Sequence, residues 1–166
     1  MADITKLSSR YSVRRMNDTD ADGILDFCLQ NTKYYEYCGK QPSKELILND
    51  LHITPPGKEA SDKYYVGFFD GGVMTAIMDL IESYPDEEHC FIGFFMMNKR
   101  LQGKQIGSEI VGEVCRYLGE EGFAAVMLGI DKGNPQSTHF WKKNGFVVIR
   151  EVERDGGTVL VAEKTL

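Results

Sequence analysis

Cysteine, histidine and long apolar runs are scarce in this chain of 166 residues, and each scarcity excludes a class of protein. The four cysteines show no C-x-x-C spacing, which argues against a disulfide scaffold or a redox motif and favours buried, reduced thiols. The three histidines lie far apart and form no H-E-x-x-H motif, so we expect no metal site. No apolar run approaches the roughly 20 residues that span a bilayer, and the sequence starts with no signal-peptide pattern. We therefore expect a cytoplasmic protein with no membrane association.

Positively charged residues are fewer than negatively charged ones. Lysine and arginine number 19 against 25 aspartates and glutamates, which gives a net charge of −6. This balance argues against a nonspecific nucleic-acid binder, which usually presents a basic face, and it is compatible with a cationic substrate. The hydrophobic content of 42% is enough for a core, and no repeat or second-domain boundary interrupts the chain. We expect one domain over residues 1–166, with a polar and loose segment over residues 1–10.

Strand and helix patterns alternate along the chain. An apolar stripe that starts after Asp22 predicts a helix, which either runs to Tyr35 or ends near Asn31. Further helices are predicted over 44–51, from Ile106 to Leu118, and after Asn134. The predicted strands cover 11–16, 63–69, 73–81, 90–97, 124–130, 146–153 and 158–163. This order predicts an α/β fold in one layer of sheet with flanking helices.

One stretch, Lys99–Val111, joins a nearly all-apolar strand to a helix through a basic turn that contains Gly103 and Gly107. Free backbone N–H groups at a helix start, together with the helix dipole, make an anion site. Glycines let a ligand approach the backbone closely. The spacing fits neither G-x-x-x-x-G-K-[ST] nor G-x-G-x-x-G, so a P-loop and a dinucleotide fingerprint are excluded. The alternative interpretation is a capped helix that simply follows a strand.

A second stretch, Asn134–Phe146, predicts a short amphipathic helix. Asn134 suits the N-cap, Pro135 suits the first helical position, and Gly145 suits the position after the helix.

Together the two stretches resemble the GNAT superfamily of N-acetyltransferases. The first resembles the family pattern Q/R-x-x-G-x-G/A, matched here by Gln102, Gln105 and Gly107, with Gln105 in place of the usual first glycine. The second resembles N-x-x-A/S-x-x-F/L-Y-x-K-x-G-F, and its matching residues are Asn134, Ser137, Phe140, Trp141, Lys143, Gly145 and Phe146. The resemblance implies a mixed, mostly antiparallel central sheet, flanked by helices, with a splayed central strand pair. It also implies transfer of an acetyl group from acetyl-CoA to a primary amine.

The resemblance implies a coenzyme A site along the strand end, the turn and the second motif. Backbone N–H groups of the strand would hold the pantetheine, and the turn would hold the pyrophosphate. The implied cofactor-binding residues are Phe95, Met96, Met97, Gln102, Gly103, Lys104, Gln105, Ile106, Gly107, Ser108, Asn134, Ser137, Phe140, Trp141 and Lys143. Trp141 stands where many members carry a tyrosine that protonates the departing thiolate, and an indole cannot do this.

The general base is the least defined part of the expected site. Some members carry a glutamate on the strand before the turn, and its position falls here on Phe91. His89 shares that strand face and has a suitable unperturbed pKa, so His89 and Glu88 are the catalytic candidates, with Glu82 and Asp79 as rivals. The alternative interpretation of His89 is a surface histidine at a strand edge.

Tyr34 and Tyr35 follow the first predicted helix and are the candidate acceptor-binding residues. Their rings suit cation–π contact and their hydroxyls suit hydrogen bonds to an amine, although amphipathic packing would also explain them. Three functions remain open from the sequence. They are an acetyltransferase for a small-molecule amine, one for a protein N-terminus or lysine, and a non-enzymatic acyl-CoA-binding module. We expect a monomer or a homodimer.

Overall fold

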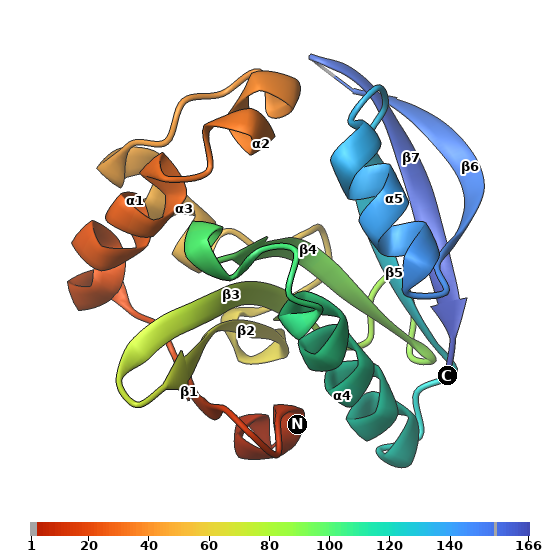
Figure 1. Ribbon diagram of the computed structural model, residues 1–166. Helices are drawn as coiled ribbons and strands as arrows, with labels where there is room; N and C mark the ends of the chain where they lie inside the picture. Colours follow the sequence, from red (N-terminus) through yellow and green to blue (C-terminus); the bar gives the residue numbers. More distant parts are fainter. Residues whose placement is uncertain (1–2, 155) are drawn as a thin grey trace.

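The computed structural model describes residues 3–154 and 156–166, which fold around one seven-stranded sheet with the strand order β1-β2-β3-β4-β5-β7-β6 (Figure 1). Neighbouring strands are antiparallel except for the parallel pair β4 and β5, so the predicted fold class is confirmed. The strands are β1 Ser12–Arg15, β2 Lys63–Asp70, β3 Val73–Ile81, β4 His89–Met97, β5 Ala125–Asp131, β6 Val147–Arg154 and β7 Gly157–Thr165. The helices are α1 Ala21–Leu29, α2 Thr32–Cys38, α3 Lys44–His52, α4 Ile106–Glu120 and α5 Pro135–Lys143. In the described part of the chain, no helix is long and apolar enough to cross a membrane.

The helices cover the two faces of the sheet, and each face has its own core. On one face α1, α2 and α3 pack against β2, β3 and β4 through a cluster that includes Ile24, Ile47 and Ile77. On the other face α4 and α5 pack through a larger cluster that includes Leu118 and Trp141. Figure 1 shows α2 and α5 on opposite sides of one end of the sheet. We call this end the open end of the sheet.

The open end arises where the parallel pair separates. The pairing of β4 with β5 starts at His89 and ends at Ile92, opposite Leu128. Gly93 and Gly129 are the first residues beyond this last pair. In the pairing of β4 with β3, Asp79 faces Phe94 whereas the next residue of β3 faces Ile92, so Gly93 is the extra residue of a β-bulge. We call this place, where the two central strands part beside the bulge, the fork.

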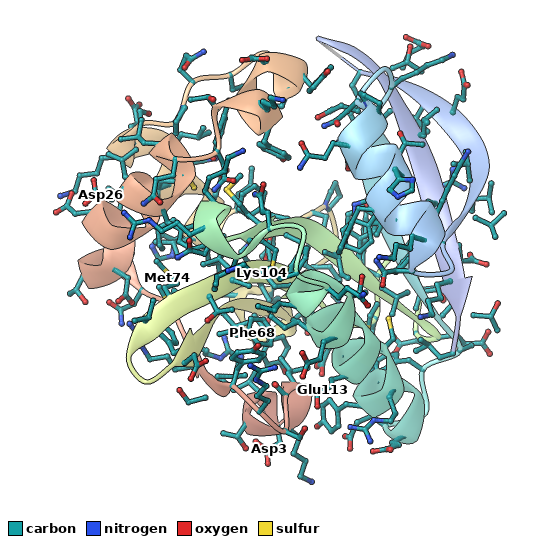
Figure 2. The ribbon with its side chains drawn as sticks, in the orientation of Figure 1. Asp3, Asp26, Phe68, Met74, Lys104 and Glu113 are labelled. Carbon is teal, nitrogen blue, oxygen red and sulfur yellow. The ribbon has the colours of Figure 1, made fainter. Side chains whose placement is uncertain are left out.

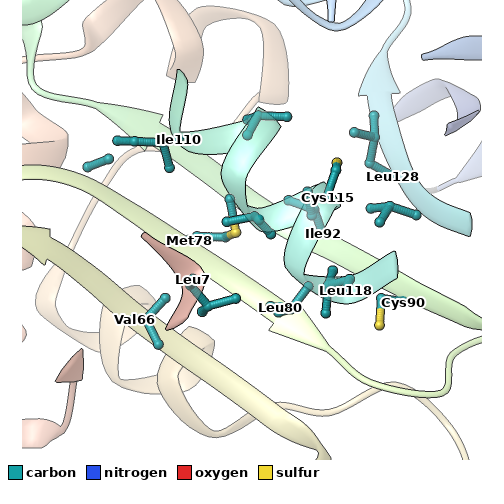
Figure 3. Close-up of a cluster of buried hydrophobic side chains, with 14 of the residues drawn as sticks. Leu7, Val66, Met78, Leu80, Cys90, Ile92, Ile110, Cys115, Leu118 and Leu128 are labelled. Carbon is teal, nitrogen blue, oxygen red and sulfur yellow. The ribbon is translucent and has the colours of Figure 1, made fainter. Parts of the chain in front are cut away.

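Helix α4 shows why the strand–turn–helix pattern could be recognised in the sequence. Its buried residues recur at the spacing of one helix face, and Ile110, Val114 and Leu118 are fully buried. Figure 3 shows Ile110, Cys115 and Leu118 of α4 in the same cluster as Met78 and Leu80 of β3. This packing fixes the start of α4 at the open end of the sheet.

The N-terminal segment differs from the prediction of a loose residue range 1–10. Of these residues the structure describes 3–10, which contain a 3₁₀ turn, Ile4–Leu7. Leu7 is fully buried in the α4 core, and Ser8 and Ser9 donate hydrogen bonds to the Glu113 carboxylate on α4. One large apolar side chain and one carboxylate are enough to hold a short polar segment against the domain.

Candidate active site

Two cavities adjoin at the fork. The first, which we call the α4–α5 cavity, has a volume of about 410 Å³ and lies between the end of β4 and the starts of α4 and α5. The second, the α2–α3 cavity, has a volume of about 420 Å³ and is lined by residues of both helices together with β3, β4 and β5. The residues that line both cavities are Tyr34, Gly93, Phe94 and Gly129. The two cavities therefore meet at these four residues.

The α4–α5 cavity brings together nearly all the residues expected to hold the cofactor. Of that set, only Lys104 and Ile106 do not line it. Figure 2 shows Lys104 at the start of α4, where its side chain is exposed. The cavity runs from the free end of β4 over the turn to α5.

The turn before α4 presents its backbone in an unusual conformation. Gly103 has a φ of 77° and Gln105 has a φ of 64°, both in the left-handed region. Gln105 is also the N-cap of α4, with no side-chain capping bond. The first N–H groups of α4 are thus left for a ligand, and the helix dipole favours an anion there. Glycine adopts this conformation without strain, whereas glutamine does not.

Asn31 is a residue of this site that the sequence analysis did not identify. It separates α1 from α2, which settles the open prediction in favour of a helix that ends before Asn31. Its Nδ2 donates to the carbonyl of Met97 at 3.3 Å, and its Oδ1 accepts a 2.6 Å hydrogen bond from Gln102. Asn31 is buried and lines the α4–α5 cavity. It links the helices on one face of the sheet to the turn before α4.

Aromatic rings form the far wall of the α4–α5 cavity. Trp141 is only 7% exposed, and its ring lies 5.0 Å from the rings of Phe140 and Phe146 and 5.9 Å from that of Phe95. Asn134 accepts a hydrogen bond from the backbone N–H of Ser137 and so caps α5, as predicted. The indole sits in a packed aromatic group, which gives it a structural role in the wall.

The α2–α3 cavity has tyrosine rings on one side. The ring of Tyr34 meets those of Tyr35 and Phe94 edge to face, at 5.1 and 5.4 Å. Burial raises the pKa of Tyr34, Tyr35 and Tyr65, so all three phenols stay protonated at neutral pH. The structure brings Tyr34 and Tyr35 to one cavity, where Tyr65 joins them.

Carboxylates from three separate elements line the same cavity. Asp50 comes from α3, Asp79 from β3 and Asp131 from β5, and burial raises the pKa of each. Asp79 is held by Lys63 of β2, whose Nζ lies 2.6 Å from Asp79 Oδ2. Basic side chains are present as well, namely Lys40, Lys132 and Arg154, all of them exposed. The carboxylates are more buried than these cations. The electrostatic attraction on a bound cation would therefore be strongest inside the cavity.

The structure does not bring His89 and Glu88 to either cavity. His89 lies in the paired end of β4, opposite Ala125, and its Nδ1 is 2.6 Å from an oxygen of Asp86. This hydrogen bond raises the pKa of His89. Glu88 is exposed before the strand begins. Phe91 lies two residues after His89 on β4, and it does line the α2–α3 cavity. The cavity lining on this strand therefore ends before His89 is reached.

Neither thiol nor metal chemistry is indicated at the fork. In the described residues all four cysteines are free, and burial raises the pKa of Cys90 to about 12 and that of Cys28 to about 11. Such thiols stay protonated at neutral pH and are poor nucleophiles. Within the same residues, no group of three or more His, Cys, Asp or Glu side chains is placed to hold a metal ion.

Comparison with solved structures places the fold among acetyltransferases. An acetyltransferase from Thermus thermophilus is similar with a TM-score of 0.75 and 19% identity, over 94% of this chain and 97% of that one. The PaiA N-acetyltransferase from Thermoplasma acidophilum, in complex with coenzyme A, gives 0.68 and 18%, over 94% and 99%. A spermidine N-acetyltransferase chimera from Vibrio cholerae and hSSAT gives 0.68 and 16%, over 95% and 96%. At these identities the similarity shows the fold alone.

Comparison of the sequence itself gives the family. No curated protein matches the chain. The model of the acetyltransferase (GNAT) family matches residues 27–146, which is most of the domain. The match includes the strand end, the turn before α4 and α5, which are the elements that build the α4–α5 cavity. The chain therefore belongs to the GNAT acetyltransferase family, whose members use acetyl-CoA.

Proposed function

We propose that this protein transfers the acetyl group of acetyl-CoA directly to the primary amine of a small molecule. The observation that carries the proposal is the meeting of the two cavities at Gly93 and Gly129. One cavity is lined by backbone and a helix start, which suit a pyrophosphate, and the other by carboxylates and tyrosine rings, which suit an ammonium group. A thioester at the end of the first cavity would face an amine at the end of the second.

The cofactor is proposed to follow the α4–α5 cavity from the turn to the fork. The pyrophosphate would accept hydrogen bonds from the backbone N–H groups between Gln102 and Ser108. The pantetheine arm would lie along Phe95, Met96 and Met97, beside the aromatic wall that contains Trp141. The indole N–H of Trp141 does not ionise near neutral pH, so the CoA thiolate leaves without a phenolic acid at this position. That is chemically tolerable, because a thiol with a pKa near 8.5 gives a fair leaving group.

The acceptor is proposed to occupy the α2–α3 cavity with its ammonium group toward the carboxylates. The cavity volume of about 420 Å³ falls in the range typical of small-molecule sites, and an open groove for a polypeptide would be expected to be longer. Tyr34 and Tyr35 would form its wall near the fork. The spermidine N-acetyltransferase chimera among the similar structures acts on a small cationic amine, which is consistent with this class of acceptor.

The first experiment measures coenzyme A binding by calorimetry in two variants at Ser108, the third residue of α4. Ser108→Glu places a negative charge where the pyrophosphate is expected and should weaken CoA binding by at least tenfold. Ser108→Ala keeps the backbone N–H group and should change the dissociation constant less than threefold. Equal CoA affinity in Ser108→Glu and wild type would show that the pyrophosphate binds elsewhere. Thiol release from acetyl-CoA, followed with a panel of primary amines, then tests the transfer itself.

A further inference from the structure

Asp79 has one carboxylate oxygen with a partner and one without. Its Oδ2 accepts a 2.6 Å hydrogen bond from the Nζ of Lys63, whereas its Oδ1 is buried and has no hydrogen-bond partner. Within residues 3–154 and 156–166, the hydroxyl of Tyr11 is the other such side-chain atom. A buried oxygen of a charged group without a donor is costly, and native structures usually satisfy it. Asp79 Oδ1 is therefore a place where a donor from outside the chain would be stabilised.

The Asp79 carboxylate belongs to the part of the α2–α3 cavity that adjoins the fork. Asp79 lines that cavity, and its cross-strand neighbours are Tyr65 on β2 and Phe94 on β4. The carboxylate packs against the bulge, because a methyl group placed on Gly93 would lie 2.8 Å from Asp79 Oδ2. Gly93 lines both cavities. The absence of a side chain at residue 93 thus lets the carboxylate approach the point where the two cavities meet.

Building on the proposed acetyl transfer, we propose that Asp79 is a catalytic residue whose carboxylate receives the ammonium group of the acceptor and takes one proton from it. The lone pair left on nitrogen attacks the thioester carbonyl carbon and forms the new C–N bond. The tetrahedral intermediate loses its second N–H proton as the C–S bond breaks, and that proton ends on the CoA thiolate. The proton on Asp79 returns to solvent. One amide, one CoA thiol and one free proton are formed from one ammonium ion and one thioester.

The groups around Asp79 shift its pKa in both directions. Burial disfavours the charged carboxylate and raises the pKa of Asp79, whereas Lys63, whose side chain is 3% exposed, acts to lower it through its charge and its hydrogen bond. The negative charge of Asp50 acts to raise it, and the Tyr65 phenol stays protonated. The titratable and charged groups facing Asp79 or lining its cavity are Lys63 and Tyr65 from β2, Tyr34, Tyr35, Tyr37 and Cys38 from α2, Lys40, Asp50 from α3, Asp131 from β5, Lys132 and Arg154 from β6.

The decisive experiment compares the pH dependence of kcat/KM in wild type and Asp79→Asn. The probe is whichever of butylamine, phenethylamine, putrescine, glucosamine and lysine wild type acetylates fastest. General bases typically contribute 10²–10⁴-fold, so Asp79→Asn should lose about 100-fold or more at pH 7, with unchanged CoA affinity. The loss should shrink about tenfold for each pH unit toward the pKa of the amine, because the variant must wait for amine that is already neutral. A merely structural role would not change this slope.

Two further variants keep the test decisive. Asp50→Asn removes a carboxylate from the same cavity and should alter the KM for the amine while keeping the wild-type pH slope. Lys63→Met/Asp79→Asn removes both charges of the buried pair, so it serves where the single variant fails to fold, and it should show the steep slope of a base-free enzyme. Asp26→Asn, on the outer side of α1 in Figure 2, is the control for expression and assay and should match wild type.

The outcomes separate the two proposals. An active wild type with a steep slope after loss of Asp79 supports the assignment. An active wild type whose Asp79→Asn variant is within twofold of it, or is equally impaired at every pH, overturns the role of Asp79 alone. A wild type that acetylates no amine of the panel overturns the proposed acetyl transfer, and the role of Asp79 falls with it.

Discussion

The α4–α5 cavity and the α2–α3 cavity have similar volumes but are built in opposite ways. The first is lined by the free end of β4, the turn before α4 and the start of α5, and it combines an aromatic wall with a helix start that has no side-chain cap. The second collects carboxylates and tyrosines from α2, α3, β2, β3 and β5. Backbone N–H groups keep their positions whatever side chains they carry, whereas a wall of side chains changes with each substitution. Under the proposed function, the cofactor and the acceptor are thus held by different kinds of structure.

This contrast predicts different consequences of substitution in the two walls. Changes in the α4–α5 wall should act mainly through packing and therefore on stability. Changes in the α2–α3 wall should act mainly on the acceptor KM or on the pH profile, as argued for Asp79. Substitutions at three places in the α4–α5 wall test that contrast.

The largest effect is expected at Trp141. Trp141→Ala removes a ring that is only 7% exposed and should lower the free energy of unfolding by roughly 3–5 kcal/mol, measured by urea titration. Trp141→Phe keeps most of the aromatic contact and should be much milder. Ile149→Ala, at a residue of β6 that is 48% exposed, is the control and should change stability by less than about 0.5 kcal/mol.

The same residue tests whether a proton donor is missing from the site. Trp141→Tyr restores the hydroxyl that many family members carry at this position, yet it should leave kcat nearly unchanged if the CoA thiolate departs unaided. A tenfold rise in kcat would show that leaving-group protonation limits the wild-type enzyme. That result would assign chemistry, and not packing alone, to the aromatic wall.

A smaller effect, also in the α4–α5 cavity, is expected for Asn31→Ala. The amide of Asn31 donates to the carbonyls of Phe27 and Met97 and accepts a hydrogen bond from Gln102, and the substitution removes all three bonds. The expected cost is about 1–3 kcal/mol of stability, with a higher KM for acetyl-CoA. Gln30→Ala changes the exposed neighbour and should do neither. An equal rise in the KM for the amine would show that the effect of Asn31 is not confined to the α4–α5 cavity.

Features that depend on a local sequence pattern could be predicted, whereas features that depend on how separate strands pair and part could not. The strand end, the turn and α4 are contiguous, so periodicity and the family motif located them together. Gly93 is different, because nothing in the local pattern says that β4 leaves β5 there or that a bulge lies against Asp79. His89 is a base candidate from the sequence because alternation along β4 places it on a suitable face, but alternation does not say where the cavity ends.

Two further differences have the same origin. Leu7 looked like part of a loose polar segment, because a single apolar residue gives no periodicity, yet tertiary packing buries it completely. Asn31 looked like an ordinary helix end, since its partners Met97 and Gln102 lie far along the chain. Isolated residues that act through distant partners carry no pattern that a sequence can reveal.

The smallest effect is expected in the turn before α4, where two neighbouring left-handed residues allow a matched pair of substitutions. Gln105 has a φ of 64°, which strains a non-glycine residue by roughly 1 kcal/mol. Gln105→Gly relieves this strain, but it also adds about 0.5–1 kcal/mol of conformational entropy to the unfolded chain, so stability should change by less than about 0.5 kcal/mol. Gly103→Ala has no steric neighbour within 4 Å, so it should lose about 1 kcal/mol from backbone strain alone.

Binding of coenzyme A separates the roles of backbone and side chain in this pair. Gln105→Gly removes a side chain from the rim of the α4–α5 cavity and leaves its N–H group in place, so calorimetry should find CoA binding unchanged or a fewfold tighter. If the backbone makes the site, the glutamine is a tolerated departure from the family glycine. A loss of more than threefold in affinity would mean that the Gln105 amide itself contacts the cofactor, and the contrast between a backbone-built and a side-chain-built cavity would fail at its most strained residue.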